Sequence, residues 1–301
     1  MQAFLQAVSK AADKEPRQCI PLDDKTTLFI SLFLCIGLVV SYLPQHYRII
    51  ANKTSEGFSA WFLLLGVVSS TSSLLNIILL QWDAIMCCKS LSTGACLEGL
   101  MGIFQIGLQW AMFSLVFILF LVYFPENKKR ESHAPSSLHL EFPSKIQPPI
   151  SAEWKVSILV AAVCIGHLAI SFFITVLLLA IVGGPEHWVT NYWAAFLGVL
   201  SMVLASFQYL PQIWKTWNSK TVGALSIPMM MLQTPGTVLF VYSLIVRPGT
   251  NWTAWITYMV TGILQGTLLT LCIIWHFRNK KLGLADLDTS VEPTERTPLL
   301  Q

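Results

Sequence analysis

Charged residues are scarce in this chain of 301 residues: Asp, Glu, Lys and Arg together make up 12%, against 54% hydrophobic residues. A soluble globular domain carries about 25% charged residues, so that class of protein is excluded. The sequence also lacks a zinc-type Cys and His spacing, a glycine-rich phosphate loop and a nucleophile elbow. We therefore expect a protein that is not an enzyme and that has no cofactor, no metal centre and no nucleic-acid partner.

Long apolar segments make up most of the sequence. Seven segments approach or exceed the roughly 20 residues that a helix needs to cross a bilayer. They lie at about 26–49, 57–81, 96–124, 154–182, 188–214, 224–246 and 253–277. The sequence therefore predicts an all-α polytopic membrane protein with seven transmembrane helices in contact with membrane lipids.

The Lys and Arg residues of the short loops predict the orientation, because such residues are retained on the cytosolic side. With a lumenal N-terminus, the cations on the cytosolic side are Arg48, Lys53, Lys128, Lys129, Arg130, Lys145, Lys155, Lys215, Lys220, Arg278, Lys280 and Lys281. The lumenal loops then hold only Lys89 and Arg247, although the N-terminal tail carries four more cations. We expect a lumenal N-terminus and a cytosolic C-terminus.

Two short motifs agree with this orientation. Asn251-Trp252-Thr253 is a glycosylation sequon that the predicted topology places in the lumen, which makes Asn251 the glycosylation candidate. The C-terminal tail ends with an acidic dileucine pattern formed by Glu295, Leu299 and Leu300. In a cytosolic tail such a pattern favours binding of clathrin adaptors and sorting to a vacuolar or lysosomal membrane. Chance is the alternative, since Leu is common.

One motif occurs twice at a fixed spacing. The segment Tyr42-Leu43-Pro44-Gln45 recurs 167 positions later as Tyr209-Leu210-Pro211-Gln212, each time at the end of an apolar run. Both copies continue through Lys-Thr to a Ser that opens the next run, and the same shift superposes Leu97-Glu98-Gly99 on Leu264-Gln265-Gly266. A repeat at a fixed offset indicates a duplicated architecture.

The duplication predicts how the chain is divided. Spans one to three correspond to spans five to seven, and the fourth span is left as a linker, in a 3+1+3 arrangement. Because the linker is a single span, both halves insert with the same orientation, as a parallel repeat. The predicted parts are a lumenal tail (1–25), a first three-helix repeat (26–124), a cytosolic linker (125–152), a linker helix (153–183), a second three-helix repeat (184–278) and a cytosolic tail (279–301).

The paired Tyr-Leu-Pro-Gln motifs, the Lys-Thr…Ser that follows them and the 3+1+3 layout resemble the PQ-loop proteins. These are relatives of the SWEET sugar carriers and of vacuolar and lysosomal amino-acid exporters such as cystinosin. The resemblance covers the seven spans and leaves out both tails and the 125–152 linker. It implies a transporter that exports a small polar metabolite, in the first place an amino acid, from a vacuole or lysosome. The alternative is a membrane receptor or nutrient-sensing scaffold of the same fold, which transports nothing.

The two prolines predict the moving parts of such a transporter. Proline inside a helix removes one backbone hydrogen bond and bends the helix. The carbonyls freed near Val40 and Phe207 need a partner in the bilayer, and the side chains of Gln45 and Gln212, or a trapped water, could supply it. We predict that Pro44-Gln45 and Pro211-Gln212 are hinges about which the two repeats rock. A static kink is the alternative.

Polar residues inside the spans are the candidates for substrate binding. Two prolines and Gly236 predict a sixth span that is broken near the midplane, where Gln233 and Thr234 would face the substrate. Asn76 in the second span and Gln265 in the seventh complete the predicted site. The hydroxyl-rich run from Ser69 to Ser73 is interpreted as helix packing.

Two ionisable residues are candidates for proton coupling, with a proton as co-substrate. Glu98 lies a turn into the third span, and burial of its carboxyl group would favour protonation in an acidic lumen. A hydrated structural role for Glu98 is the alternative. His167 lies in the middle of the linker helix, where a packing role for a neutral imidazole is favoured over a proton relay.

The resemblance also has gaps. Cystinosin-like members carry a proton-binding Asp where Gln233 stands, and exporters of cationic amino acids carry a Gly-Asp pair where Ser69-Ser70 stand. Without these acids, a cationic substrate would be poorly paired in a site of low dielectric constant. The resemblance therefore implies a polar substrate without net positive charge.

Cysteines fall into two groups. Cys19, Cys87, Cys88 and Cys96 are predicted to lie on the lumenal side, where an oxidising compartment allows disulfides, including one that pins the N-terminal tail over the second lumenal loop. Their pairing stays open. Cys35, Cys164 and Cys272 lie inside spans and are interpreted as packing residues.

Overall fold

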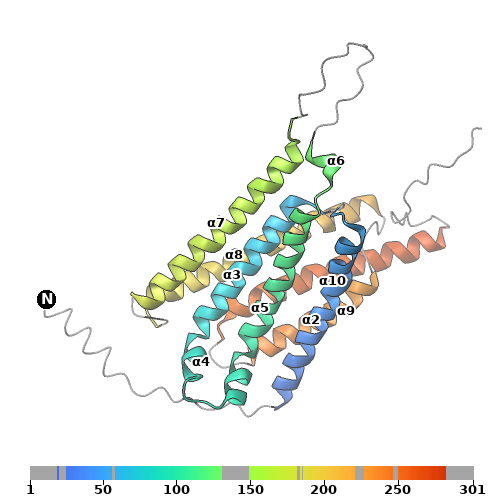
Figure 1. The fold of residues 1–301 in the computed structure, drawn as a ribbon. Coiled ribbons are helices and arrows are strands. Elements are labelled where there is room, and N and C mark those ends of the chain that lie inside the picture. Colours follow the sequence, from blue (N-terminus) through green and yellow to red (C-terminus); the bar gives the residue numbers. More distant parts are fainter. Residues whose placement is uncertain are drawn as a thin grey trace, which may run out of the picture.

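The computed structural model describes residues 19, 25–55, 58–130, 149–181, 184, 186–220, 227–246 and 250–282. Apart from one isolated bridge between Arg130 and Ile150, the regular structure of these residues is helical. The helices are α2 (Lys25–Asn52), α3 (Ala60–Leu80), α4 (Trp82–Cys87), α5 (Thr93–Val122), α6 (Glu126–Lys129), α7 (Ala152–Ala180), α8 (Trp188–Ser219), α9 (Ile227–Ile245) and α10 (Trp252–Lys281) (Figure 1).

Six of these helices are long and apolar enough to cross a membrane: α2, α3, α5, α7, α8 and α10. Helix α9 corresponds to the predicted sixth span and has 19 residues. The seven long helices overlap the seven predicted spans, although several extend further. Helix α8, for example, continues to Ser219, beyond the predicted end at 214.

Polar side chains fix where several helices begin. The hydroxyl of Ser92 accepts a hydrogen bond from the backbone N–H of Ala95, and the hydroxyl of Ser151 accepts one from the N–H of Trp154. The side-chain oxygen of Asn251 accepts one from the N–H of Trp252. Such caps satisfy N–H groups that have no partner inside the helix.

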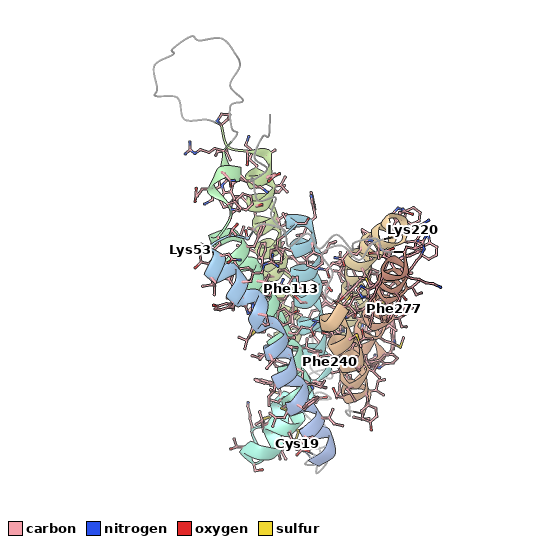
Figure 2. All side chains as sticks on the ribbon, turned by 90° about the vertical axis from the view of Figure 1, so that its right-hand side faces the viewer. Cys19, Lys53, Phe113, Lys220, Phe240 and Phe277 are labelled. Carbon is pink, nitrogen blue, oxygen red and sulfur yellow. A yellow bond between two sulfur atoms is a disulfide. The ribbon has the colours of Figure 1, made fainter. Side chains whose placement is uncertain are left out.

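The long helices form two groups of three. In the first half, α5 packs between α2 and α3; in the second half, α10 packs between α8 and α9. Helix α7 lies mainly against α3. We call the end of the bundle near Cys19 and α4 the disulfide end, and the opposite end, near Lys53 and Lys220, the lysine end (Figure 2).

The two halves meet through equivalent pairs of helices. The first helix of each half packs against the second helix of the other, so α8 contacts α3 and α2 contacts α9. The contact between α3 and α8 is much the larger of the two. Figure 2 shows the halves side by side near Phe240 and separating toward Lys53 and Lys220.

The repeat extends to the backbone conformation. Lys53 and Lys220, which follow the last residues of α2 and α8, have φ angles of 50° and 54°. Among the described residues they are the two non-glycine residues with positive φ. Both helices therefore end with a left-handed residue, a common way to terminate a helix.

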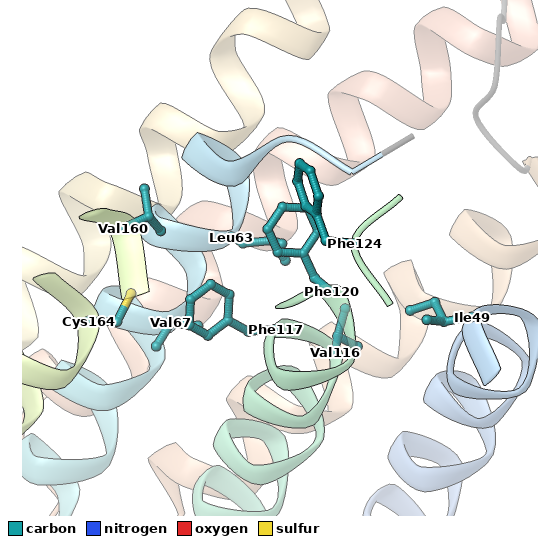
Figure 3. Packing of buried hydrophobic residues seen from close by; sticks show 9 residues of the cluster. All are labelled: Ile49, Leu63, Val67, Val116, Phe117, Phe120, Phe124, Val160 and Cys164. Carbon is teal, nitrogen blue, oxygen red and sulfur yellow. The ribbon is translucent and has the colours of Figure 1, made fainter. Parts of the chain in front are cut away.

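Buried apolar side chains form separate clusters at the lysine end. The first-half cluster is built around Leu63, Val116 and Phe120 of α3 and α5, and also includes Ile49, Val67, Phe117, Phe124, Val160 and Cys164 (Figure 3). The second-half cluster contains Met230, Leu268 and Cys272, with Tyr209 packed against it. Each of these clusters stays within its own half or, in the first half, also reaches α7.

Near the disulfide end one cluster joins the halves. Its buried members come from five helices: Leu34, Ile77, Ile106, Phe240, Leu244, Ala254 and Tyr258. A smaller cluster connects Leu75 and Leu79 of α3 with Ala194 and Leu197 of α8. The apolar core is therefore continuous across the halves only toward the disulfide end, as far as the described residues show.

The prediction of a broken sixth span is wrong, because α9 runs without interruption from Ile227 to Ile245. Pro228 lies in the first turn, where its missing N–H would have no partner inside the helix. Pro235 lies inside the helix. The hydroxyls of Thr234 and Thr237 donate to the carbonyls of Met230 and Gln233, each four residues earlier in the helix.

Candidate functional site

Pro44 and Pro211 occupy equivalent places in their helices. Each lies eight residues before the last helical residue, Asn52 in α2 and Ser219 in α8. Both helices continue on either side of the proline. The neighbouring amides, Gln45 and Gln212, are half-buried and make no hydrogen bond with the described part of the chain. The suggestion that these amides bind the freed carbonyls therefore finds no contact in the structure.

The tyrosines of the two motifs pack against different clusters. Tyr42 packs against the first-half cluster and Tyr209 against the second-half cluster. Tyr258 of α10 belongs to the cluster that joins the halves. The three tyrosines therefore belong to three different clusters.

His46 supports Tyr42 from one turn further along α2. The two rings stack, with their centroids 6.1 Å apart. The Nε2 atom of His46 lies 3.1 Å from the carbonyl oxygen of Met112 on α5. Because a carbonyl only accepts, this nitrogen carries the proton and donates. The contact orients the buried imidazole, and with it the Tyr42 ring.

Gln233 and Gln265 form a direct pair between α9 and α10. The Nε2 atom of Gln265 donates to Oε1 of Gln233 at 3.0 Å. Gln265 lies seven residues after Tyr258, so both side chains lie on one face of α10, two turns apart. Thr234, the third predicted residue of this group, donates its hydroxyl to its own helix.

Hydroxyl groups join α3 to α8 beside the tyrosines. Ser69 donates to the carbonyl oxygen of Ser201 at 2.9 Å, and the hydroxyls of Ser73 and Ser201 lie 2.6 Å apart. The interpretation of the serine run as helix packing is confirmed for Ser69 and Ser73, which are buried in this interface.

Asn76 lies apart from the glutamine pair, nearer the disulfide end. It is 1% exposed, and its Nδ2 atom donates to the carbonyl of Ala194 at 2.6 Å and to the hydroxyl of Thr253 at 3.2 Å. A Cβ atom added to Gly198 of α8 would lie 2.7 Å from the carbonyl oxygen of Thr253. Asn76 therefore contributes hydrogen bonds to a close crossing of α3, α8 and α10. The prediction that it lies with Gln233 and Gln265 is wrong.

Two further polar contacts connect the halves near the disulfide end. Ser243 of α9 donates to Oε1 of Gln105 on α5 at 3.3 Å. Gln81, which caps α3, donates to the hydroxyl of Thr250 before α10 at 3.2 Å. Gln105 is 1% exposed and Ser243 is fully buried, so this contact is shielded from solvent and lipid.

The two proton-coupling candidates are far apart in the chain and in the fold. His167 lies on α7, with its Nε2 atom 3.4 Å from the hydroxyls of Ser72 and Ser171. It therefore faces the interface between α7 and α3. Glu98 is half-buried in the second turn of α5, toward the disulfide end.

The four cysteines of the disulfide end form two bonds. Cys19 pairs with Cys87, and Cys88 pairs with Cys96. The predicted bond between the tail and the second loop is therefore confirmed. The sequence left the partner open, because adjacent Cys87 and Cys88 offer both choices. Cys35, Cys164 and Cys272 are buried inside the bundle and form no disulfide, in agreement with the interpretation as packing residues.

Several predicted sites lie at or beyond the limits of the described residues. Asn251 is exposed, and its side chain caps α10. The sorting residues Glu295, Leu299 and Leu300 lie outside the described part, as do most of the 1–25 tail and residues 131–148 of the linker.

Sequence reasoning missed Tyr42, Tyr209, His46 and Tyr258 as site residues. The two motif tyrosines stand at the first position of the repeated segment, so the duplication itself was the available signal. For Tyr258 and His46 no spacing in the sequence indicated a role, because each is placed by contacts with helices distant in the chain.

The comparisons with known proteins agree with the repeat. The family model described as "PQ loop repeat" matches residues 28–86 and 193–253, so the two matches end 167 positions apart. The chain belongs to the PQ-loop repeat family. The first match covers α2 to α4, and the second covers most of α8, α9 and the start of α10.

A relative in Schizosaccharomyces pombe, "Uncharacterized protein C4C5.03", is 35% identical over 274 residues. The aligned region covers 89% of this chain and 86% of the relative. Family membership and the six apolar helices together identify a multi-pass membrane protein of the PQ-loop type.

Proposed function

We propose that this PQ-loop protein is a transporter that exports a small polar metabolite, in the first place an amino acid, from a vacuole or lysosome. All seven long helices cross the membrane in this proposal, α9 included, as two parallel three-helix repeats joined by α7. Transport proceeds by rocking of the two halves about Pro44 and Pro211.

The observation that carries the proposal is the uneven packing of the halves. A buried cluster drawn from five helices joins them near the disulfide end, whereas at the lysine end each half keeps its own cluster. Helices α3 and α8 stay in contact toward the lysine end, where Gln208 donates to the carbonyl of Phe62. The other described helices of the two halves share no apolar cluster at that end, and such uneven packing is suited to alternating access. The matched prolines lie in α2 and α8, the first helix of each half.

The orientation follows from the chemistry of the two ends. Disulfides persist in oxidising compartments, so the end with Cys19–Cys87 and Cys88–Cys96 is assigned to the lumen. Basic residues such as Lys53, Lys129 and Arg278 gather at the opposite end, which is assigned to the cytosol. The described state is then closed toward the lumen. A proton is retained as a candidate co-substrate, with Glu98 as the group that faces the lumenal side.

A flux measurement tests the proposal. The full chain is reconstituted into lipid vesicles, and uptake of radiolabelled amino acids and sugars is followed with and without a pH gradient. Saturable uptake above that of protein-free vesicles is expected for at least one substrate. Absence of flux across the whole panel, with correctly folded protein, would contradict the assignment as a transporter.

A further inference from the structure

Positive charge gathers where α8 and α10 end, on the second half of the lysine end. The segments 211–220 and 274–282 contain no Asp or Glu, and their Lys and Arg residues are Lys215, Lys220, Arg278, Lys280 and Lys281. The first half is mixed in charge at this end, because Glu126 of α6 forms an ion pair with Lys129 at 2.6 Å. The ends of α8 and α10 therefore favour an anionic ligand.

Specific contacts hold these two helix ends together. The buried side chain of Asn279 donates from its Nδ2 atom to the carbonyl oxygen of Lys220 at 3.0 Å. The rings of Trp217 and Trp275 meet edge to face, with their centroids 6.2 Å apart. Lys220 lies one turn beyond Trp217 on α8, so its place relative to the cations of α10 is fixed by both contacts.

Arg278 is held over an aromatic ring. Its Cζ atom lies 5.1 Å from the centroid of the Trp275 ring, one turn earlier on α10. This cation–π contact positions the guanidinium group and uses none of its N–H donors. The planar group matches a phosphate, to which it can donate two parallel hydrogen bonds. Lys281 follows one turn later on the same face and is exposed, as Lys220 is.

Exposed aromatic rings accompany the cations. Trp214, Trp217 and Phe277 are 69%, 55% and 65% exposed. Figure 2 shows Lys220 and Phe277 at the same end of the second half. In membrane proteins, tryptophan is enriched at the depth of the lipid headgroups, because its ring is apolar and its N–H is polar. The cations therefore lie at the level where the phosphate groups of lipids are the neighbouring anions.

We propose that the ends of α8 and α10 bind the headgroup of an anionic phospholipid, with Arg278 on its phosphate and Lys220 and Lys281 beside it. Clusters of Lys and Arg next to a membrane helix attract such lipids. With the lysine end assigned to the cytosol, the site faces the leaflet that carries anionic lipids. The site is separate from the proposed transport, because it binds a lipid of the membrane and not the cargo.

The first half lacks this site although it keeps two of the cations. After the shift of 167 positions, Arg48 and Lys53 correspond to the two lysines of α8. The three cations of α10 have no charged counterparts. Ala111 stands at the position of Arg278, and Leu108 stands at that of the tryptophan below it. The duplication therefore provides a matched control with cations at the same end but without the stacked arginine.

Binding of short-chain lipids to the purified full chain in a neutral detergent tests the site. The probes are the dioctanoyl forms of phosphatidylinositol monophosphate, phosphatidylserine and phosphatidylcholine, and the free inositol bisphosphate headgroup. Both anionic lipids should bind more tightly than phosphatidylcholine, and the phosphatidylinositol monophosphate about tenfold or more. Equal affinity for all three lipids overturns the proposal. Binding of the free headgroup as tightly as the lipid would indicate a soluble phosphate ligand and also overturns it.

Variants of exposed side chains identify the residues. An Arg278→Gln, Lys220→Gln double variant should lower the affinity for phosphatidylinositol monophosphate about tenfold. The control is the Arg48→Gln, Lys53→Gln double variant, which removes two cations from the same end of the first half and should change the affinity less than about twofold. All four side chains are exposed, so both variants should fold. Equal losses in the two would indicate general attraction by positive charge and overturn the site.

A conservative substitution tests the stacked guanidinium. Arg278→Lys keeps the charge but loses the planar group, so the affinity for phosphatidylinositol monophosphate should fall about threefold. Unchanged affinity overturns the direct contact of Arg278 with the phosphate.

Acidic residues that follow α10 in the sequence are the alternative partner of these cations. Asp286, Asp288 and Glu292 lie outside the described residues. An Asp286→Asn, Asp288→Asn, Glu292→Gln triple variant should bind the lipid equally well or up to about threefold more tightly. Lipid binding by the triple variant alone, and none by the unaltered chain, would make these acidic residues the occupant and overturn the proposal.

Discussion

Close approaches of single residues set the contacts between helices. Gly198 of α8 lies against the backbone of Thr253, and Asn76 donates to the same threonine from α3. In a membrane, helices gain little from the hydrophobic effect between them, so packing of small residues and hydrogen bonds carries the association. One added methyl group at Gly198 should therefore disturb the packing of the three helices that cross there.

Replacing Gly198 with Ala should destabilise the protein. The new Cβ would lie 2.7 Å from the Thr253 carbonyl oxygen and 2.8 Å from the Thr253 Cβ, so α8 and α10 must move apart. The expected loss is about 1–3 kcal/mol, measured as a lower temperature of unfolding in detergent. The control is Gly37→Ala, where no atom lies within 4 Å. It should be neutral or slightly stabilising, by about 0.5–1 kcal/mol, because alanine favours the helix. Equal behaviour of the two variants would contradict the close crossing.

The left-handed lysines give a second residue-scale prediction. Lys53 and Lys220 have φ angles of 50° and 54°, a region that costs a residue with a Cβ about 1 kcal/mol and costs glycine almost nothing. Lys53→Gly and Lys220→Gly should therefore each raise the stability by up to about 1 kcal/mol, whereas Val at either position should lower it. The same unfolding assay applies, with Arg48→Gly inside α2 as the control that should destabilise. A loss of stability with both glycines would show that the lysine side chains matter more than the backbone.

At the scale of elements, the duplicated helices α2 and α8 carry the hinges of the proposed mechanism. Helices α2 and α8 each continue through a proline eight residues before their last residue. Each lacks one backbone hydrogen bond at the same level, so each is easier to bend there than elsewhere.

Replacing both prolines should lower the transport rate without lowering the stability. In a Pro44→Ala, Pro211→Ala double variant the missing hydrogen bonds can form, so the stability should stay equal or rise, while flux in vesicles should fall several-fold. Pro125→Ala, outside the long helices, is the control and should transport normally. Unchanged flux in the double variant would show that the prolines are static kinks and not hinges.

The two disulfides should contribute unequally to stability. Cys19–Cys87 spans 68 residues and Cys88–Cys96 spans 8, and a longer loop loses more entropy in the unfolded chain. Cys19→Ser should therefore cost about 2 kcal/mol more than Cys96→Ser in thermal unfolding.

The freed thiols also report the orientation. After Cys19→Ser, an impermeant maleimide should label Cys87 from the lumenal face of sealed vesicles. Labelling from the cytosolic face would reverse the assignment of the two ends.

At the scale of the whole molecule, the asymmetry between the ends corresponds to one state of the proposed transport cycle. The halves are joined near the disulfide end by apolar packing and by the Ser243–Gln105 and Gln81–Thr250 hydrogen bonds. A transporter must break these contacts to admit cargo from the lumen.

Locking the disulfide end should stop transport. The side chains of Gln81 and Thr250 lie within hydrogen-bonding distance at 3.2 Å. Because cysteine is shorter than glutamine, a Gln81→Cys, Thr250→Cys double variant should be cross-linked between the halves by a short bifunctional thiol reagent. Flux should fall to the level of protein-free vesicles once cross-linked, whereas either single variant should retain it. Transport at the normal rate by the cross-linked protein would mean that this end does not open.

The positions of the helices and the equivalence of the two halves could be predicted from the sequence. The positions of the helices follow from apolar runs, since burial of backbone polar groups in lipid permits little else. The equivalence of the halves follows from the motif at Tyr42 and Tyr209. The two wrong predictions, the break in α9 and the place of Asn76, were both drawn from residue type alone. Pro228 and Pro235 suggested a break in α9, but one lies in the first turn, and threonine hydroxyls bond to carbonyls beside the other. Asn76 was grouped with Gln233 by polarity, although their depths in the bundle differ.

The sequence by itself determined the helices, the duplication and the PQ-loop family, because hydrophobic length and repeated motifs are local properties of the chain. Only the tertiary structure decided which cysteines pair, which polar residues meet and which end of the bundle is closed. These depend on contacts between helices that are distant in sequence, such as Asn76 with Thr253 and Gln233 with Gln265. In a bundle where nearly every helix face is apolar, composition does not distinguish a face turned to lipid from one turned to its partner.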